Sequence, residues 1–175
     1  GTAHYVPIDE KHPLQGQSPY SASKIGADKL AESFRLSFNL PVVTVRPFNT
    51  YGPRQSARAI IPTVITQCLT GNTVRLGNLT PTRDLNYISD TVNGFLMAAE
   101  SEQAIGRTVN LGGGQEISIG NLAQRIARLI DKDIVIVSDE QRIRPKGSEV
   151  ERLLADNRLA SELIGWQPTV SLDQG

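Results

Sequence analysis

Tyr20 and Lys24 are the residues whose types and spacing point most directly to chemistry. They stand four positions apart in the stretch Ser18-Pro19-Tyr20-Ser21-Ala22-Ser23-Lys24, and on a helix this spacing places both side chains on one face. An ammonium beside a phenol favours the phenolate, which is a general base. Moving the pKa of a tyrosine from about 10 to about 7 requires roughly 4 kcal/mol. One lysine at the edge of water supplies only part of this, so we expect a second positive charge nearby.

Tyr-x-x-x-Lys also occurs by chance on solvated surface helices, so the neighbouring residues must show whether this pair is functional. Ser18 is a suitable N-cap and Pro19 suits the first helical position, which predicts a helix over residues 19–38. Apolar residues lie on two sides of this helix. We therefore expect it to be covered on two sides, by its own sheet and by another subunit, with ordinary packing inside one chain as the alternative.

Composition removes several classes of function. The chain has 175 residues, with 18 basic and 18 acidic side chains and no basic stripe, which argues against nucleic acid as a partner. Cys68 is the only cysteine, which excludes an internal disulfide and predicts a reducing, cytoplasmic location. No apolar run has membrane-spanning length and the N-terminus is no signal peptide, so we expect no membrane. His4 and His12 lack partners at ligand spacing, so we expect no metal.

Strand and helix patterns alternate along the chain, which predicts an α/β fold. Residues 42–45 form a continuous apolar run that is typical of a buried parallel strand. The polar loop after it, residues 46–55, lies where ligands bind in open α/β sheets, although a plain turn is the alternative. After the loop, we predict a helix over 60–69 and strands over 74–76, 82–88, 108–111 and 134–137. Ser89 and Ser118 are predicted to cap two further helices, the first of which carries Val92, Phe95, Leu96 and Ala99 on one face. A last helix is predicted to be capped by Asp156 and ended by Gly165.

The glycine run Gly112–Gly114 does not predict a cofactor site. A dinucleotide-binding turn needs G-x-G-x-x-G spacing between a strand and a helix, and Ile117 stands where the last glycine belongs. We therefore interpret the run as an ordinary turn.

Four motifs together resemble one enzyme family. They are Ser18-Pro19-Tyr20 with Lys24, Arg46-Pro47-Phe48-Asn49 followed by Tyr51-Gly52-Pro53-Arg54-Gln55, Thr82-Arg83-Asp84 with Tyr87 and Asp90, and Gly165-Trp166 with Pro168. Their order and spacing are similar to those of the extended short-chain dehydrogenases, the NAD-dependent nucleotide-sugar epimerases and dehydratases. Residues 5–13, 54–59 and 139–145 look closest to the nucleotide-activated N-acetylglucosamine 4,6-dehydratases of legionaminic-acid-type sugar biosynthesis.

The resemblance begins partway through the family's pattern. The Gly-rich cofactor turn, the ribose-binding acid, the Ser/Thr partner of the tyrosine and the dehydratase acid/base pair would precede Gly1, so the resemblance implies a C-terminal half. It implies that residues 1–56 are the last piece of a Rossmann-type NAD-binding domain. Residues 57–175 would form the small α/β substrate-binding domain, with strand 108–111 as a candidate to return to the sheet. Pairing of strand 108–111 with strand 42–45 would leave a small open sheet with exposed edges, so we expect the chain to swap or dimerise to cover them, or its first fifty residues to be loosely ordered. The resemblance also implies a homodimer through helix 19–38.

The resemblance also implies a mechanism for the intact enzyme. Tyr20, as phenolate, takes the proton of the sugar 4-hydroxyl while hydride passes from C4 to NAD. Lys24 supports the phenolate and binds the nicotinamide ribose, and the oxidised nicotinamide is the second positive charge. The 4-ketone acidifies C5, water is lost across C5–C6, and the hydride returns to C6.

Further residues are implied as contacts to a nucleoside diphosphate sugar. Asn49 would bind the pyrophosphate region and Arg83 and Arg144 would supply charge-assisted contacts, with Arg54 and Gln55 as weaker candidates. The backbone of residues 74–76 would flank the base. Each arginine alone could equally be a solvated surface charge.

Three hypotheses remain open. The first is a portion of a 4,6-dehydratase, inactive by itself because this chain has no pyrophosphate turn. The second is a 4-epimerase of the same family. The third is a non-catalytic remnant that binds nucleotide sugar or only dimerises.

Overall fold

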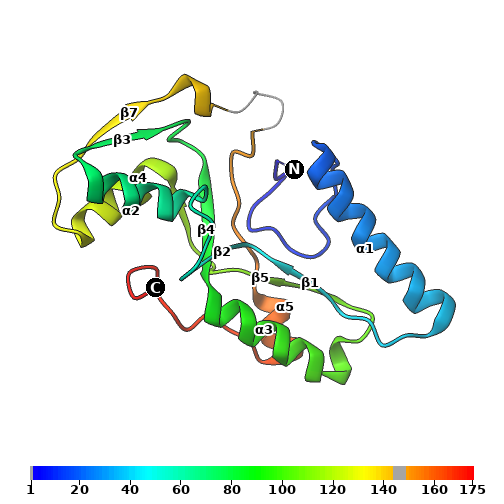
Figure 1. Cartoon of the computed structure of the whole chain (residues 1–175). Helices are drawn as coiled ribbons and strands as arrows, with labels where there is room; N and C mark the ends of the chain where they lie inside the picture. The colour runs from blue at the N-terminus through cyan, green and yellow to red at the C-terminus, as the bar shows by residue number, and fades with distance from the viewer. Residues whose placement is uncertain (1, 144–148) are drawn as a thin grey trace.

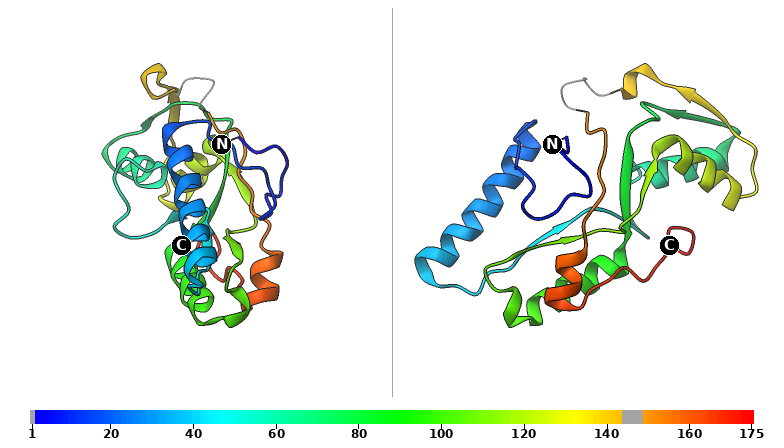
Figure 2. Two further views of the ribbon diagram at one scale, coloured as in Figure 1. Left: turned by 90° about the vertical axis from the view of Figure 1, so that its right-hand side faces the viewer. Right: turned by 180° about the vertical axis from the view of Figure 1, so that it is seen from behind.

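The protein is described by a computed structural model that covers residues 2–143 and 149–175. Helices and short, mostly parallel strands build it, so the predicted α/β class is confirmed. Helix α1 (Pro19–Phe38) stands on one side of the molecule, and α2 (Ile60–Thr70) and α4 (Ile119–Leu129) lie together on the other (Figure 1). The view from behind in Figure 2 shows the same separation.

Strands β1 (Thr44–Pro47) and β5 (Thr108–Leu111) form a two-stranded parallel sheet. Thr44 pairs with Thr108 and Pro47 with Leu111. The predicted apolar run begins at Val42, two residues before β1 starts. The Val42 carbonyl accepts a 2.7 Å hydrogen bond from the N–H of Gly106, which lies just before β5, so the contact between the two segments extends beyond the paired strands. Strand β5 thus joins the strand that follows α1, while the proposed domain boundary at residue 56 stays a prediction.

Strands β2 (Asn49–Tyr51), β4 (Thr82–Tyr87) and β6 (Glu116–Ser118) form the second sheet, in the order β2-β4-β6. The β2–β4 pair is parallel and the β4–β6 pair is antiparallel. Because β1 and β2 are separated only by Phe48, the carboxyl end of β1 runs directly into this sheet.

The third sheet pairs β3 (Thr73–Leu76) with β7 (Val135–Ser138) in parallel, and a short 3-10 helix, η2 (Glu140–Arg142), follows β7. Helices α2 and α4 pack with this sheet around one apolar core. Fully burying one such Val or Leu side chain contributes about 1.5–3 kcal/mol. Its buried members are Val64, Cys68, Val74, Leu76, Leu122, Ala123 and Ile126.

Helix α3 (Ile88–Glu100) does not pack through its face of large apolar residues. On that face, Val92, Phe95 and Leu96 are 46–57% exposed. The buried residues are Asp90, Thr91, Gly94 and Ala98. Small side chains let the helix approach β5 closely, since a Cβ added at Gly94 would lie 2.4 Å from Leu111 Cδ1.

A second core lies between α3, β5 and the C-terminal segment. It includes the 3-10 helix η1 (Glu102–Ala104) and helix α5 (Arg158–Ile164). Trp166 is fully buried in it, and its indole Nε1 donates a 2.9 Å hydrogen bond to the carbonyl of Asp90. Its buried members are Ala98, Ala104, Val109, Leu111, Ala160, Ile164 and Trp166.

Two helix starts differ from the sequence prediction. Strand β4 runs straight into α3, so the N-cap is Tyr87 and not Ser89. The N-cap of α5 is Asn157, whose side chain bonds the backbone of Gly112, while Asp156 accepts a 3.0 Å bond from the Arg158 N–H. The predicted caps at Ser18 and Ser118 are confirmed, as is the left-handed Gly165 at the end of α5.

The N-terminal loop contacts the body of the protein through Ile8. The Ile8 N–H donates a 2.7 Å hydrogen bond to the carbonyl of Leu154, and the Asp156 N–H donates a 2.9 Å bond to the Ile8 carbonyl. This single parallel bridge fixes the middle of a segment that otherwise has no regular structure.

Candidate active site

Helix α1 begins as its first residues require. Ser18 and Ser21 form a reciprocal capping box, with the Ser18 N–H donating to Ser21 Oγ at 2.8 Å and the Ser21 N–H donating to Ser18 Oγ at 3.2 Å. Pro19 occupies the first turn, where it removes no helical hydrogen bond. The cap therefore fixes where the helix starts, and with it the positions of Tyr20 and Lys24.

Three of the predicted site residues line one cavity of about 620 Å³. Tyr20 and Lys24 reach it from α1, and Asn49 reaches it from the start of β2. Tyr20 is 74% exposed, so the phenol is open to a ligand. Phe48 lines the cavity beside Asn49, at the carboxyl end of β1, which is the position that the sheet topology predicted for a site.

The N-terminal loop forms another wall of this cavity. Asp9, His12, Leu14 and Gln15 all contribute to the lining. The Asp9 carboxylate accepts a 2.6 Å hydrogen bond from the Tyr5 hydroxyl, which raises the pKa of Tyr5. Within the loop, the His4 backbone N–H donates to His12 Nε2 at 2.9 Å, so the loop is organised by its own side chains.

Glu10 attaches this wall to β5. Its carboxylate accepts a 2.8 Å hydrogen bond from the backbone N–H of Asn110, and Asn110 Nδ2 donates a 3.0 Å bond to the Ile8 carbonyl. Desolvation by burial raises the pKa of Glu10, against the lowering effect of the Asn110 N–H. Asn110 also lines the cavity. The loop is thus held at the edge of β5 that faces away from β1.

Asp28 and Arg46 form an ion pair at the floor of the cavity. Arg46 Nε donates to Asp28 Oδ2 at 2.8 Å, with 26% and 28% of the two side chains exposed. Both residues line the cavity with Tyr20 and Lys24. The pair links α1 to β1.

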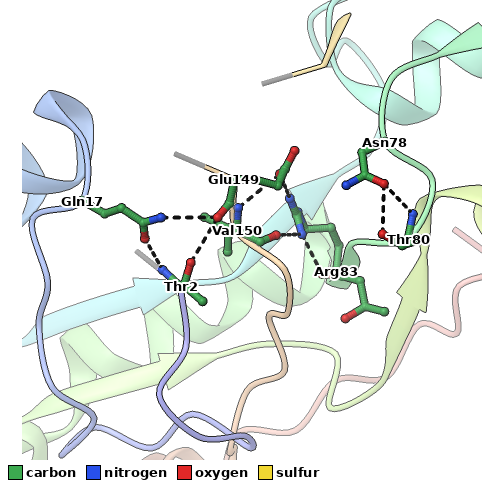
Figure 3. Close-up of polar contacts among 8 residues, drawn as sticks. Thr2, Gln17, Asn78, Thr80, Arg83, Glu149 and Val150 are labelled. Atoms are coloured by element: carbon green, nitrogen blue, oxygen red, sulfur yellow. Dashed lines mark hydrogen bonds and ion pairs between the residues drawn. The ribbon is translucent and has the colours of Figure 1, made fainter. Parts of the chain in front are cut away.

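Arg83, a predicted phosphate contact, lies outside the lining of this cavity. Its guanidinium is directed toward Val150 and Glu149 (Figure 3), donating to the Val150 carbonyl at 2.7 Å and lying 3.5 Å from Glu149 Oε1. Only 13% of the Arg83 side chain and 11% of the Glu149 side chain are exposed, so the pair is largely shielded from water. Thr2 and Gln17 donate to the Glu149 carbonyl at 3.1 and 3.3 Å, which connects this cluster to the N-terminal loop.

The remaining predicted contacts are dispersed. Arg54 is exposed in the turn after β2, has a left-handed φ of 67°, and does not line the cavity. Gln55 Nε2 donates to the Thr50 carbonyl at 2.9 Å, while its Oε1 is buried and has no partner among the described residues. Arg144 lies outside the described residues. In β3, Val74 and Leu76 are buried and Arg75 faces outward.

The N–H groups of the glycine run are engaged within the protein, that of Gly112 by Asn157 Oδ1 and the other two by a carboxylate. Asp84 is fully buried, and its carboxylate accepts hydrogen bonds from the N–H groups of Gly113, Gly114 and Ala155. Burial raises the pKa of Asp84, and these three donors oppose the shift. The run forms the irregular connection between β5 and β6, with a bend at Gly114, and its donors serve the protein interior.

A comparison with protein families identifies the chain. The family model described as GDP-mannose 4,6 dehydratase matches residues 1–175. The chain belongs to this family of extended short-chain dehydrogenases. One curated relative of this chain is a UDP-glucose 4-epimerase from Mycolicibacterium smegmatis, which is 30% identical over 100% of this chain and 56% of the relative. A dTDP-glucose 4,6-dehydratase from Streptomyces griseus is 34% identical over 100% of this chain and 52% of the relative. The chain therefore spans about half the length of the curated relatives it matches.

Solved structures agree with this family and confirm the Rossmann-type fold. An epimerase from Methanothermobacter thermautotrophicus superposes with a TM-score of 0.90 at 26% identity, covering 100% of this chain and 53% of that one. DesIV, a dTDP-glucose 4,6-dehydratase from Streptomyces venezuelae solved with NAD and TYD bound, gives a TM-score of 0.87 at 28% identity over 100% and 53% of the two chains. The family thus contains nucleotide-sugar epimerases and dehydratases that bind NAD-type cofactors.

The described residues fit one end of such a cofactor. Tyr20 and Lys24 place a hydroxyl and an ammonium in the lining of the cavity, and both groups can hydrogen-bond ribose hydroxyls. For the pyrophosphate of the cofactor, the glycine run in the described part of the chain offers no available donors at Gly113 and Gly114, because their N–H groups are bound to Asp84.

Residues 2–143 and 149–175 contain no cluster of three or more His, Cys, Asp or Glu side chains arranged to hold a metal ion. Across the same residues, every helix is too short or too polar to cross a membrane.

Glu10, Asp28, Arg46 and Asn110 are site residues that sequence reasoning did not select. Asp28 could have been found, because it lies four residues after Lys24 and so continues the Tyr20–Lys24 face of the helix. Glu10 and Asn110 are 100 residues apart, and no local pattern connects them.

Proposed function

We propose that this chain is the catalytic-pair and substrate-binding portion of an NAD-dependent nucleotide-sugar 4,6-dehydratase that acts on a nucleoside diphosphate N-acetylglucosamine. The observation that supports it most is that Tyr20, Lys24 and Asn49 line one cavity of about 620 Å³. A cavity of this size takes a sugar ring together with part of a cofactor.

Tyr20 acts as the base for oxidation at C4. Its exposed phenolate accepts the proton of the sugar 4-hydroxyl, and the Lys24 ammonium stabilises the negative charge from one helical turn away. Bound NAD supplies a hydride acceptor at C4 and a hydride donor at C6. The C5 proton becomes acidic beside the resulting ketone, and water leaves across C5–C6. A proton returns to C5 when hydride is added at C6, which gives the 4-keto-6-deoxy product.

Asn49, Arg54, Arg83 and Arg144 bind the substrate's two phosphates in this proposal. The role of Asn49 is supported by its position in the lining of the same cavity as Tyr20 and Lys24. Arg83 has a competitor, since the Glu149 carboxylate lies 3.5 Å from its guanidinium. A phosphate that binds Arg83 must displace this contact or share the guanidinium with it, because Arg carries five N–H donors.

Binding of substrate tests this assignment without requiring turnover. UDP-, GDP- and dTDP-N-acetylglucosamine are titrated calorimetrically into the chain, and Asn49→Ala and Arg83→Met are expected to weaken binding about tenfold. Glu149→Gln is expected to tighten it, because the competing carboxylate is gone. Arg128→Met, on the distant helix α4, is the matched control. Equal affinity in all four variants would remove the phosphate assignment.

By itself, this chain is expected to be inactive. Its glycine amides are engaged by Asp84, so the described residues lack a pyrophosphate cradle. Incubation with NAD and nucleotide sugar, followed by mass spectrometry, should yield no product that has lost one water. Robust formation of that product would contradict the expectation.

A 4-epimerase is the second candidate, because two relatives at 30% and 29% identity are named UDP-glucose 4-epimerase or putative UDP-glucose 4-epimerase. An epimerase product has the mass of its substrate, whereas a dehydratase product is lighter by one water. The same assay on a longer protein that contains this chain therefore separates the two reactions.

We also propose that α1 mediates a homodimer, in a cytoplasmic protein to which the buried free thiol of Cys68 is suited. The structure corrects one expectation here, because its own sheet covers α1 only in part: one face, which includes Ile25, Asp28 and Ala31, is half-buried, and no residue of the helix is buried. Leu30, Phe34 and Phe38 are 60%, 46% and 66% exposed. Sedimentation should show self-association that Phe34→Glu weakens, and a strict monomer at high concentration would oppose the proposal.

A further inference from the structure

We propose that Arg46 is a positioning residue that keeps the Lys24 ammonium available to Tyr20 by holding the carboxylate of Asp28. This inference rests on the proposed role of the Tyr20–Lys24 pair. It starts from the observation that Tyr20, Lys24 and Asp28 follow one another at four-residue intervals on α1 and all line the same cavity.

Asp28 is a natural competitor for Lys24. Oppositely charged side chains four residues apart on a helix attract each other by about 0.2–0.5 kcal/mol when exposed. An ammonium paired with Asp28 would be drawn one turn away from the phenol and partly neutralised. The helix alone therefore leaves Lys24 with two possible partners, on either side of it.

Arg46 resolves this competition in favour of Tyr20. Its Nε–Oδ2 distance to Asp28 is 2.8 Å, which is typical of a charge-assisted hydrogen bond. Arg46 is fixed in β1 opposite Asn110 of β5, so the sheet and not the helix sets where the guanidinium lies. Within the described residues, Lys24 has no hydrogen bond or ion pair, which agrees with an ammonium left free for the cavity.

Other charged groups lie near Asp28, but among the described residues the ion pair formed by its carboxylate is with Arg46. Beyond the ion pair, a hollow of about 60 Å³ is also lined by Lys29, Glu32, Arg35 and Arg107. Lys29 is committed to Glu32 at 2.7 Å. On the cavity side, Asp9 and His12 come from the N-terminal loop. Arg46 is the cation that the structure pairs with Asp28.

The test follows the ε-ammonium of Lys24 by ¹⁵N NMR in the folded chain, with the Lys29 signal, paired to Glu32, as an internal reference. Arg46→Met should move the Lys24 ammonium shift toward that of the paired Lys29 and slow its exchange with water, because Asp28 is released to bind it. Adding Asp28→Asn to Arg46→Met should return the signal to its original position. Arg46→Lys, which retains a cation, should leave the signal near its original position.

A merely structural ion pair predicts a different pattern. In that case the double variant behaves like Arg46→Met, since both have lost the link between α1 and β1. An unchanged Lys24 signal in Arg46→Met, or no return in the double variant, overturns the proposal. If Arg46→Met does not fold, Arg46→Gln gives the same comparison with a hydrogen-bonding but neutral side chain. Because the readout needs no nucleotide sugar, failure of the substrate-binding assignment and failure of this proposal are distinguishable.

Discussion

The carboxylate of Glu10 accepts a 2.8 Å hydrogen bond from the backbone N–H of Asn110, which joins the N-terminal loop to β5 across 100 residues of sequence. Since burial raises the pKa of Glu10 above its ordinary value of 4.5, the folded protein holds this proton more tightly than the unfolded chain does. The contribution of Glu10 to stability is therefore fully present below pH 4.5 and is lost as pH rises through the raised value.

Glu10→Gln should remove this dependence, because a neutral amide still offers an oxygen to the Asn110 N–H. We expect the free energy of unfolding of the wild type to fall relative to that of the variant as pH is raised from below 4.5 toward neutrality. Urea unfolding of both proteins at several pH values measures this difference in the free energy of unfolding. A wild type that gains stability over the variant in that window would contradict the prediction.

Asp84→Asn should destabilise the fold by about 1–3 kcal/mol at neutral pH. Both carboxylate oxygens accept from backbone N–H groups, Oδ1 from Gly113 and Oδ2 from Gly114 and Ala155. An amide presents one oxygen, so at least one buried N–H faces another donor. Chemical unfolding measures the loss, with Asp133→Asn on the exposed surface as the control, expected within about 0.5 kcal/mol of wild type. Equal effects of the two changes would refute the role of Asp84.

Gly94→Ala should cost about 1–3 kcal/mol, because the new methyl would lie 2.4 Å from Leu111 Cδ1 and 3.0 Å from Trp166 Nε1. Gly26→Ala is the matched control in a helix interior. Nothing in the described chain lies within 4 Å of a Cβ at Gly26, so alanine should stabilise α1 by up to about 1 kcal/mol. Thermal unfolding of both variants measures these changes in stability. The prediction fails if Gly94→Ala is as stable as the wild type.

Gly26→Ala also examines the dimer. A second copy packed closely on α1 at Gly26 would meet the new methyl, and self-association would weaken even as the helix is stabilised. Sedimentation of this variant beside Phe34→Glu therefore shows whether the contact between copies includes the middle of the helix or only its apolar C-terminal half.

The sequence predicted those parts of the fold that local chemistry decides. Ser18 with Pro19, Ser118 and Gly165 end or begin helices through contacts with their immediate neighbours, and these predictions are confirmed. The buried face of α3 could not be predicted from size and apolarity, since Val92, Phe95 and Leu96 are all exposed. The helix instead packs through Gly94 and Ala98, which allow a close approach to β5.

The candidate site, like the fold, could be predicted from the sequence only where it depends on residues close together in the chain. Tyr20 and Lys24 were selected by their spacing, and the loop after the strand was selected by its position in the sheet. Within that loop, Asn49 was singled out by the family resemblance, and all three residues line the cavity. The contacts of Glu10 with Asn110, Asp28 with Arg46, and Arg83 with Glu149 join residues that are 100, 18 and 66 positions apart. Such contacts depend on how distant segments meet in space, and periodicity along the chain carries no signal for them.

Helix α1 buries none of its residues in this chain, whereas α4 buries Leu122, Ala123, Ile126 and Ala127. Isolated helices are marginal in water, so α1 belongs to the least protected part of the molecule and its amides should exchange with solvent before those of α4. Tyr20 and Lys24 thus lie on a helix with no buried residue of its own. A surface that packs against α1 would also restrict the motion of these two residues, so we expect it to keep the pair aligned.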